Sequence, residues 1–145
     1  MAVTPLSSRA QKLLRLAHGE AESVGSADIA SEHLLLGALA LGGYLTSALC
    51  SKSSLSLQAL RHSLGSGVPK VSGCRYSESA ETIFRAAVAI SRSLRHKRVD
   101  AAHIVLALLG EKEGEASRAL DLFNVRRQGA QSQIRRRLRK RKRPL

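Results

Sequence analysis

Two stretches of this chain carry the same residue pattern 70 positions apart. Residues 30–39, with the sequence ASEHLLLGAL, have a degenerate echo in residues 100–109, DAAHIVLALL. At this offset no gap is needed before Leu109, and the residues that recur unchanged are Ser7/Ser77, Ala10/Ala80, Arg15/Arg85, Ala17/Ala87, Ser23/Ser93, His33/His103, Leu36/Leu106 and Leu39/Leu109. The repeat predicts one helical unit that is duplicated, with each copy burying a face that it cannot bury alone.

Each copy opens with the spacing of a long amphipathic helix. Apolar residues recur three or four positions apart at Ala10, Leu13, Leu14, Ala17, Ala21 and Val24, and the second copy has Ala80, Ile83, Phe84, Ala87, Ser91 and Leu94 in the same phases. Ser7 or Ser8 can cap the first helix and Ser77 the second. Gly25 is expected to end the first helix, whereas Arg95 stands at the equivalent position of the second copy.

A shorter and almost wholly apolar helix is expected next in each copy, over residues 31–41 and 100–109. Because apolar residues occupy all sides of these segments, we expect them at the centre of each bundle, with Leu35 and Leu36 buried. Further helices are predicted over residues 45–51, 56–64, 115–123 and 127–140. The predicted fold class is therefore all-α, with two pseudo-symmetric four-helix repeats and about eight helices.

The segment between the copies is rich in Gly, Ser and Pro. Residues 65–73, with the sequence GSGVPKVSG, contain few residues that could join a core, and they predict a linker. A length of 145 residues suits one compact domain. We expect that domain to comprise repeat one (6–64), a linker (65–75), repeat two (76–138) and a basic tail (139–145).

Positive charge is concentrated at the C-terminal end. The chain has 24 Lys and Arg residues against 11 Asp and Glu, and ten of these cations lie in residues 126–145, which contain no acid. Ala130, Ile134 and Leu138 can form an inward stripe on a last helix. The cations that could then contact nucleic acid or another anion are Arg135, Arg136, Arg137, Arg139, Lys140, Arg141, Lys142 and Arg143. No aromatic residue lies among them to stack on bases, and a solvated end without a dedicated partner is the alternative.

The sequence contains no catalytic or metal-binding motif that we recognise. It lacks GxxxxGK[ST], HExxH and GxSxG, and its five histidines show no metal-ligand spacing. Cys50 and Cys74 form no CxxC, so neither a disulfide framework nor a zinc site is expected. We predict a protein that is not an enzyme and uses no cofactor. His33 and His103, one in each core helix, are predicted to act structurally, through packing and a hydrogen bond near the helix N-terminus.

No apolar run approaches the ~20 residues that span a bilayer, and Gly37 interrupts the longest candidate, residues 34–41. Residues 1–18 lack acids, as organelle transit peptides do. Their removal would delete most of a helix whose counterpart in the second copy is structural, so we expect no cleavage. The expected location is cytoplasmic, with an organelle stroma or matrix left open.

Several of these features together resemble the Clp N-terminal (Clp R) domain. They are the run EHLLLGAL at residues 32–39, the preceding Ile29, a long helix ended by Gly25, and a duplication of about this period. The resemblance covers residues 6–138. Domains of this family cap the Clp/Hsp100 unfoldase ATPases and also occur alone as small accessory proteins. The resemblance implies a two-repeat, eight-helix domain that binds substrates or adaptors and does no chemistry itself.

The resemblance also implies a site. In phosphoarginine-reading members of the family, a Glu that opens the core helix of each copy contacts the modified guanidinium group. Here Ser31 and Glu32 occupy that position in the first copy and become the candidate partner-binding residues. Ala101 and Ala102 replace them in the second copy, so paired recognition would be halved. The alternative for Glu32 is a carboxylate that only stabilises the helix dipole.

Because these residues contain no ATPase module, the resemblance implies that unfolding power must come from another chain. The expected function is a non-catalytic adaptor or accessory factor of a Clp-type (Hsp100) chaperone-protease. Its partners would be the ATPase, the protease, or their substrates and adaptors. The alternative is a nucleic-acid- or ribosome-associated helical protein that acts through residues 126–143.

Overall fold

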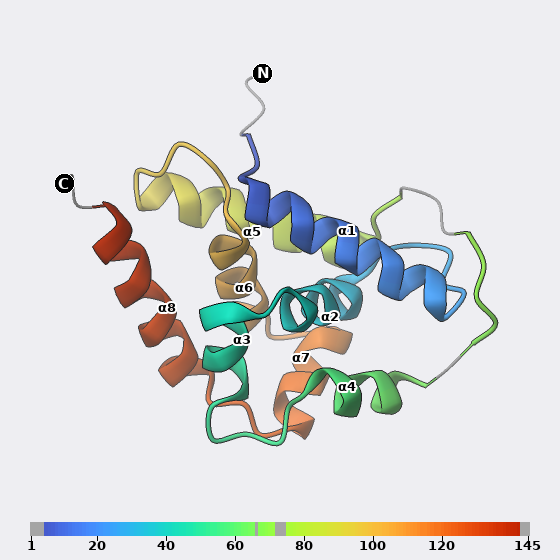
Figure 1. Cartoon of the computed structure of the whole chain (residues 1–145). Helices are drawn as coiled ribbons and strands as arrows, with labels where there is room; N and C mark the ends of the chain where they lie inside the picture. The colour runs from blue at the N-terminus through green and yellow to red at the C-terminus, as the bar shows by residue number, and fades with distance from the viewer. Residues whose placement is uncertain (1–4, 66, 72–74, 143–145) are drawn as a thin grey trace.

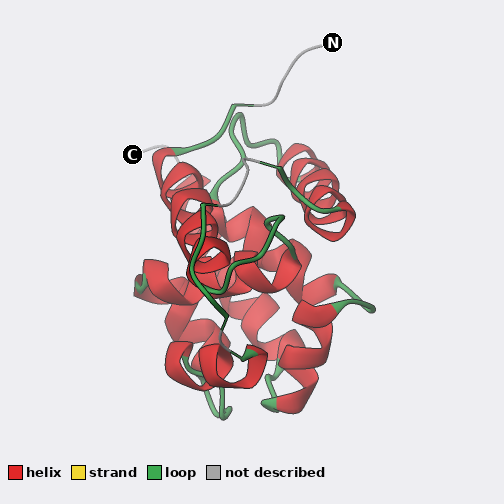
Figure 2. Ribbon diagram, turned by 90° about the vertical axis from the view of Figure 1, so that its right-hand side faces the viewer, coloured by secondary structure: helices red, strands yellow, loops and turns green. Residues whose placement is uncertain are grey.

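The computed structural model describes residues 5–65, 67–71 and 75–142, with side chains described as far as Lys140. Within these residues the chain forms eight α-helices and no strand (Figures 1 and 2), which confirms the all-α prediction with two four-helix repeats. The helices are α1 (Ser8–Ser23), α2 (Ser31–Leu41), α3 (Gly43–Cys50), α4 (Leu57–Leu64), α5 (Glu78–Ser93), α6 (Ala101–Gly110), α7 (Glu115–Leu122) and α8 (Arg127–Lys142).

Helices α2 and α6 form the centre of the molecule, as their apolar sequences predict. Helix α2 packs against α1 and α3–α7, and α6 packs against α1, α2, α5, α7 and α8. Figure 1 shows both in the middle of the bundle. Leu35 and Leu36 are 0% and 2% exposed, and every residue from Ala101 to Leu109 is buried. Burial of these two helices therefore supplies much of the apolar surface that the fold removes from water.

The two long helices begin and end at equivalent residues. The Oγ of Ser7 accepts a hydrogen bond from the N–H of Ala10 at 3.1 Å, and the Oγ of Ser77 accepts one from Ala80 at 3.2 Å. Past the end of α1, Gly25 has a φ of +70°, the left-handed conformation that ends many helices. Arg95 adopts the same conformation after α5, with a φ of +59°, although a Cβ disfavours it.

Two boundaries differ from the sequence prediction by two residues. Helix α3 begins at Gly43 because positive φ angles at Gly42 and Gly43 let the chain turn sharply and start a helix at once. Helix α8 continues to Lys142, since Arg and Lys favour helix and neither Gly nor Pro occurs in residues 130–142. Residues 139–142 of the predicted tail are thus helical. Arg143 lies outside the described residues.

The segments that lead into the helices exchange backbone hydrogen bonds between the two copies. Before α1, the N–H of Ser7 donates to the carbonyl of Val99, the residue that leads into α6, at 2.9 Å. Before α5, the N–H of Ser77 donates to the carbonyl of Ile29, which leads into α2, also at 2.9 Å. The isolated parallel bridges Leu6–Val99 and Ile29–Tyr76 are thus equivalent under the 70-residue offset. We call these two pairings the crossed bridges.

The first copy packs its opening helix closely onto its core helix at a glycine. A Cβ atom built on Gly37 in α2 would lie 2.7 Å from the carbonyl oxygen of Leu13 and 3.0 Å from the backbone nitrogen of Ala17, both in α1. The first distance is shorter than real Cβ contacts, and the second is tighter than most of them. The second copy has Ala107 at the equivalent position, so α5 and α6 accommodate a methyl group there.

In the described part of the chain, no single helix is long and apolar enough to cross a membrane. The bent pair α2 and α3, at 114° to one another, meets the criteria of length and composition only when taken together. No cluster of three or more His, Cys, Asp or Glu side chains suited to a metal ion occurs among the same residues. Cys50 is a free thiol, and Cys74 lies outside the described residues.

Candidate functional site

The N-terminus of α2 is held by His33, which thereby positions the neighbouring Glu32. The Nδ1 of His33 accepts a hydrogen bond from the N–H of Ala30 at 2.9 Å. In the second copy, Nδ1 of His103 accepts from the N–H of Asp100 at 2.8 Å. Each imidazole thus takes the place of the acidic or amide side chain in a capping box. The predicted structural role of the histidine pair is confirmed.

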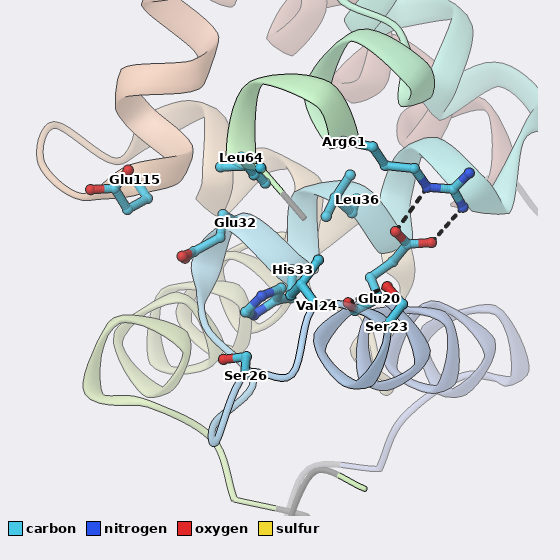
Figure 3. A pocket seen from close by; sticks show the side chains of 11 residues that line it. Glu20, Ser23, Val24, Ser26, Glu32, His33, Leu36, Arg61, Leu64 and Glu115 are labelled. Atoms are coloured by element: carbon cyan, nitrogen blue, oxygen red, sulfur yellow. Dashed lines mark hydrogen bonds and ion pairs between the residues drawn. The ribbon is translucent and has the colours of Figure 1, made fainter. Parts of the chain in front are cut away.

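A cavity of about 490 Å³ lies beside this helix start, between α1, α2, α4 and the beginning of α7 (Figure 3). Its lining residues are Glu20, Ser23, Val24, Ser26, Glu32, His33, Leu36, Arg61, Leu64, Gly65 and Glu115. We call it the Glu32 cavity. Figure 3 shows Glu32 and Glu115 on one side and the Glu20–Arg61 pair on the other. The cavity therefore combines acidic groups with an apolar wall.

Two of the three carboxylates in the Glu32 cavity are already paired. Glu20 binds Arg61 through two hydrogen bonds of 2.9 and 2.6 Å, and this contact raises the pKa of Arg61. Glu115 lies 2.7 Å from Nη1 of Arg118. Glu32 has no hydrogen bond or ion pair with any described residue. It is the acid whose charge is left uncompensated by a close cation.

His33 adds no positive charge to the cavity at neutral pH. Burial lowers its pKa, with Glu32 and Glu20 opposing the shift. Because Nδ1 accepts the N–H of Ala30, the neutral imidazole carries its proton on Nε2. The cavity can therefore offer an N–H donor from His33 and a carboxylate from Glu32, an arrangement suited to a cationic or hydrogen-bonding group.

Of the two residues predicted for the site, only Glu32 lines the cavity. Ser31 is 1% exposed, and its backbone N–H donates to the Oγ of Ser79 at 3.2 Å. The hydroxyl of Ser31 is buried and has no hydrogen-bond partner among the described residues. Ser31 thus lies under the site, where it contacts the start of the second copy.

Among the described residues of the second copy, Glu20 and Glu32 have no acidic counterparts. Ile90 stands at the position of Glu20, and the fully buried Ala102 at that of Glu32. Near the equivalent place there is a cavity of about 200 Å³, lined by Ser93, Leu94, Arg95, His96, Leu138 and Arg139. The extra turns of α8 supply its last two residues, and its charged residues are cations. The two copies therefore present pockets of opposite charge.

Sequence reasoning missed Glu20, Arg61 and Glu115. They come from α1, α4 and α7, and Glu20 and Arg61 are 41 positions apart. No local motif connects such residues, because tertiary packing alone brings them together. The sequence did indicate one residue of this cavity, Glu32, through its position in the first turn of α2.

The predicted cations of the C-terminal end lie on α8 as far as the structure describes them. Arg136, Arg137, Arg139 and Lys140 are exposed and Arg135 is partly buried. The inward stripe of Ala130, Ile134 and Leu138 is buried, as the spacing predicts. Arg141 and Lys142 belong to α8, but their side chains are outside the described part, as is the whole of Arg143.

The chain matches the model of the Clp repeat (R) N-terminal domain over residues 2–72 and again over 75–144. These two matches cover nearly all of the sequence and coincide with the two copies. The chain belongs to the Clp repeat (R) N-terminal domain family.

Two particular relatives are much longer proteins. Over 132 residues the chain is 30% identical to the negative regulator of genetic competence ClpC/MecB of Bacillus subtilis and 29% identical to the chaperone protein ClpB of Oceanobacillus iheyensis. The match covers 88% of this chain but 16% of each relative. This chain therefore spans about a sixth of the length of these relatives.

Solved structures share the fold. The N-terminal domain of the chaperone ClpD from Arabidopsis thaliana superimposes with a TM-score of 0.75 at 24% identity, covering 92% of this chain and 96% of that domain. The Hsp104 N-terminal domain from Candida albicans gives a TM-score of 0.72 at 17% identity, covering 90% and 89%. At these identities the likeness concerns the fold.

Proposed function

We propose that this chain is a non-catalytic binding module that receives a polypeptide segment of a Clp substrate or adaptor in the Glu32 cavity. The observation that carries the proposal is the carboxylate of Glu32, which has no close cationic partner in an otherwise compensated cavity. Membership of a family of Clp N-terminal domains supports a role in recognition.

The chemistry of the cavity favours a cationic side chain as the bound group. A guanidinium can donate two hydrogen bonds to one carboxylate, as Arg61 already does to Glu20 within the same cavity. Val24, Leu36 and Leu64 form an apolar wall against which the stem of an Arg or Lys can pack. The proposed ligand is therefore an Arg or Lys flanked by apolar residues.

Fluorescence anisotropy with a labelled Arg-containing peptide tests this assignment. Because a hydrogen bond to a charged group contributes about 1.5–3 kcal/mol, Glu32→Gln should weaken binding roughly tenfold or more. Glu22→Gln is the matched control, since it removes an acid of α1 that does not line the cavity. Equal affinities for Glu32→Gln and the parent protein would reject the site.

The peptide itself provides a second control. Replacing its Arg by Gln should reduce binding to the parent protein but have little further effect on Glu32→Gln, because one interaction is removed in both cases. A peptide that carries phosphoarginine in place of Arg measures how the modification of the guanidinium group changes affinity. With Ala102 in place of a second Glu, we expect at most one such group to bind per chain.

The proposed cellular role is that of an accessory factor of a Clp-type chaperone-protease in the cytoplasm. ATP-dependent co-purification with an Hsp100 ATPase from native lysate tests it, using the full chain and a version truncated after Lys140, which keeps the buried residues of α8. Both should retain the ATPase. The comparisons do not favour the nucleic-acid alternative. That alternative would be preferred if nucleic acid were recovered in place of the ATPase, and if this recovery fell with added salt and with truncation of the chain.

A further inference from the structure

A second cavity, of about 270 Å³, lies between α3 and α8 and shares no residue with the Glu32 cavity. Its lining residues are Tyr44, Ser47, Gln133, Arg136, Arg137 and Lys140. Every one of these side chains can donate a hydrogen bond, three of them are cations, and none is acidic. We call it the Tyr44 cavity.

Two guanidinium groups lie over the ring of Tyr44. The Cζ atoms of Arg9 and Arg137 are 5.0 and 4.8 Å from the ring centroid, both within the range of a cation–π contact. Arg9 is also 3.9 Å from Oδ2 of Asp100. These contacts restrict the cations and gather positive charge around one phenol.

The hydroxyl of Tyr44 is buried and has no hydrogen-bond partner among the described residues. Burial of a polar group without a partner is unfavourable, and such a group calls for an explanation. A ligand oxygen that accepts from this hydroxyl would remove the cost. Tyr44 therefore lines the cavity and also has a hydroxyl whose donor is unused.

The cations of the Tyr44 cavity lack acidic partners in the described part of the chain. Arg136, Arg137 and Lys140 lie on neighbouring turns of α8, and none of them takes part in a described ion pair. An adjoining cavity of about 510 Å³, lined by Ser132, Arg136, Arg139 and Lys140, continues the positive surface. Like charges at this spacing repel, so an anion bound among them would be favoured.

We propose that the Tyr44 cavity binds a phosphoryl group. A phosphate monoester carries a charge of about −1.5 to −2 and three acceptor oxygens, which match several cations together with hydroxyl and amide donors. A carboxylate offers one charge and two oxygens and would leave part of this donor set unused. The group can come from free phosphate or from a phosphorylated side chain of a bound protein.

Isothermal titration with inorganic phosphate, at ionic strength held constant with sodium chloride, measures the site directly. Tyr44→Phe removes the hydroxyl but keeps the ring under the guanidinium groups. It should weaken phosphate binding about tenfold, the loss expected for a hydrogen bond to a charged group. Arg137→Gln should also weaken it. Lys112→Gln, which removes an exposed cation outside the cavity, should bind like the parent protein.

A thermal melt separates binding from folding. Without phosphate, Tyr44→Phe should melt at the same temperature as the parent protein or higher, because it loses only an unpartnered hydroxyl. With phosphate, the parent should gain stability and the variant should gain much less. Loss of stability in the variant without phosphate would show that the hydroxyl is structural and would overturn the assignment.

Peptides distinguish the two sources of the phosphoryl group. If a phosphoserine peptide binds more tightly than inorganic phosphate and the same peptide with serine does not bind, the ligand is a phosphorylated partner. If the phosphoserine peptide and inorganic phosphate bind equally well, the ligand is free phosphate. Both results support the site. The proposal would be overturned if the protein bound duplex DNA, if removal of any α8 cation weakened this binding equally, and if Tyr44→Phe left it unchanged. A Tyr44→Phe variant with the parent's affinity for phosphate would also overturn it.

Discussion

His103 makes the stability of the fold sensitive to acid. Burial lowers the pKa of His103 to about 4, with His96 adding to the shift and Asp100 opposing it. Its Nδ1 accepts from the N–H of Asp100 and its Nε2 lies 2.8 Å from Nδ1 of His96, so a second ring proton has no acceptor at Nδ1. The folded protein therefore favours the neutral imidazole.

We expect the free energy of unfolding to fall as the pH drops below about 6.5, where the histidine of the unfolded chain takes up a proton. Linkage gives a loss of about 2 kcal/mol at pH 5 and about 3 kcal/mol at pH 4 from this residue. Urea titrations from pH 7 to 4 measure it. His103→Asn keeps an acceptor for the N–H of Asp100 and should flatten this part of the pH profile; an unchanged slope would contradict the assignment.

Leu35 and Glu32 lie three positions apart in α2 but should respond differently to truncation. Leu35 is 0% exposed, so Leu35→Ala should cost about 2–5 kcal/mol through lost burial and the cavity left behind. Glu32→Ala should cost about 1 kcal/mol or less, since it removes only a dipole contact. Urea melts of the two variants provide the comparison. Equal small losses would mean that α2 is not a core helix.

At the scale of the helix, the close approach of α1 and α2 predicts an unusual response to alanine. Ala favours helix over Gly by about 1 kcal/mol. A Cβ at Gly37 would nevertheless meet the backbone of Leu13 and Ala17, and overpacking of this kind costs about 1–3 kcal/mol. Gly37→Ala should therefore reduce stability. Ala107→Gly, the reverse change at the equivalent position, should also reduce it, by about 1 kcal/mol. A more stable Gly37→Ala variant would show that α1 moves aside easily.

Helix α8 has separable parts. Ala130, Ile134 and Leu138 pack inward, whereas the cations that follow Leu138 face solvent as far as they are described. Truncation after Lys140 should keep the helical circular-dichroism signal and most of the stability. Truncation after Gly129 should lose both, because it removes three buried side chains. Similar melting of the two truncated forms would contradict the buried stripe.

Periodicity predicted the helices because it depends on neighbours within one turn or two. The spacing of apolar residues along the chain is enough to predict that Leu13, Ile83, Leu35 and Ile104 are buried. The left-handed conformation of Arg95 cannot be predicted in this way, because it follows from α5 ending at the position where Gly25 ends α1. The site was predicted at Glu32 by resemblance, but its pairings depend on α1, α4 and α7 meeting in space. Such contacts have no signature along the chain.

At the scale of the whole molecule, each copy completes the other. The crossed bridges place the segment before α1 beside that before α6, and the segment before α5 beside that before α2. We therefore expect residues 1–69 and 70–145, prepared separately, to show little cooperative folding and to recover the helical signal on mixing. Circular dichroism of each fragment and of the mixture measures this. Cooperative unfolding of either fragment alone would contradict it.

The equivalence of the crossed bridges also has a consequence for association. Two identical chains, each with a single copy, could form both pairings about one two-fold axis, as an isologous dimer does. Joining the copies in one chain replaces that bimolecular step with an intramolecular one, at an effective concentration of order millimolar when the connection is short. Dilution therefore cannot separate the halves, and the sequence of each half is free to diverge. The acidic pocket beside Glu32 and the basic pocket beside Arg95 are such a divergence.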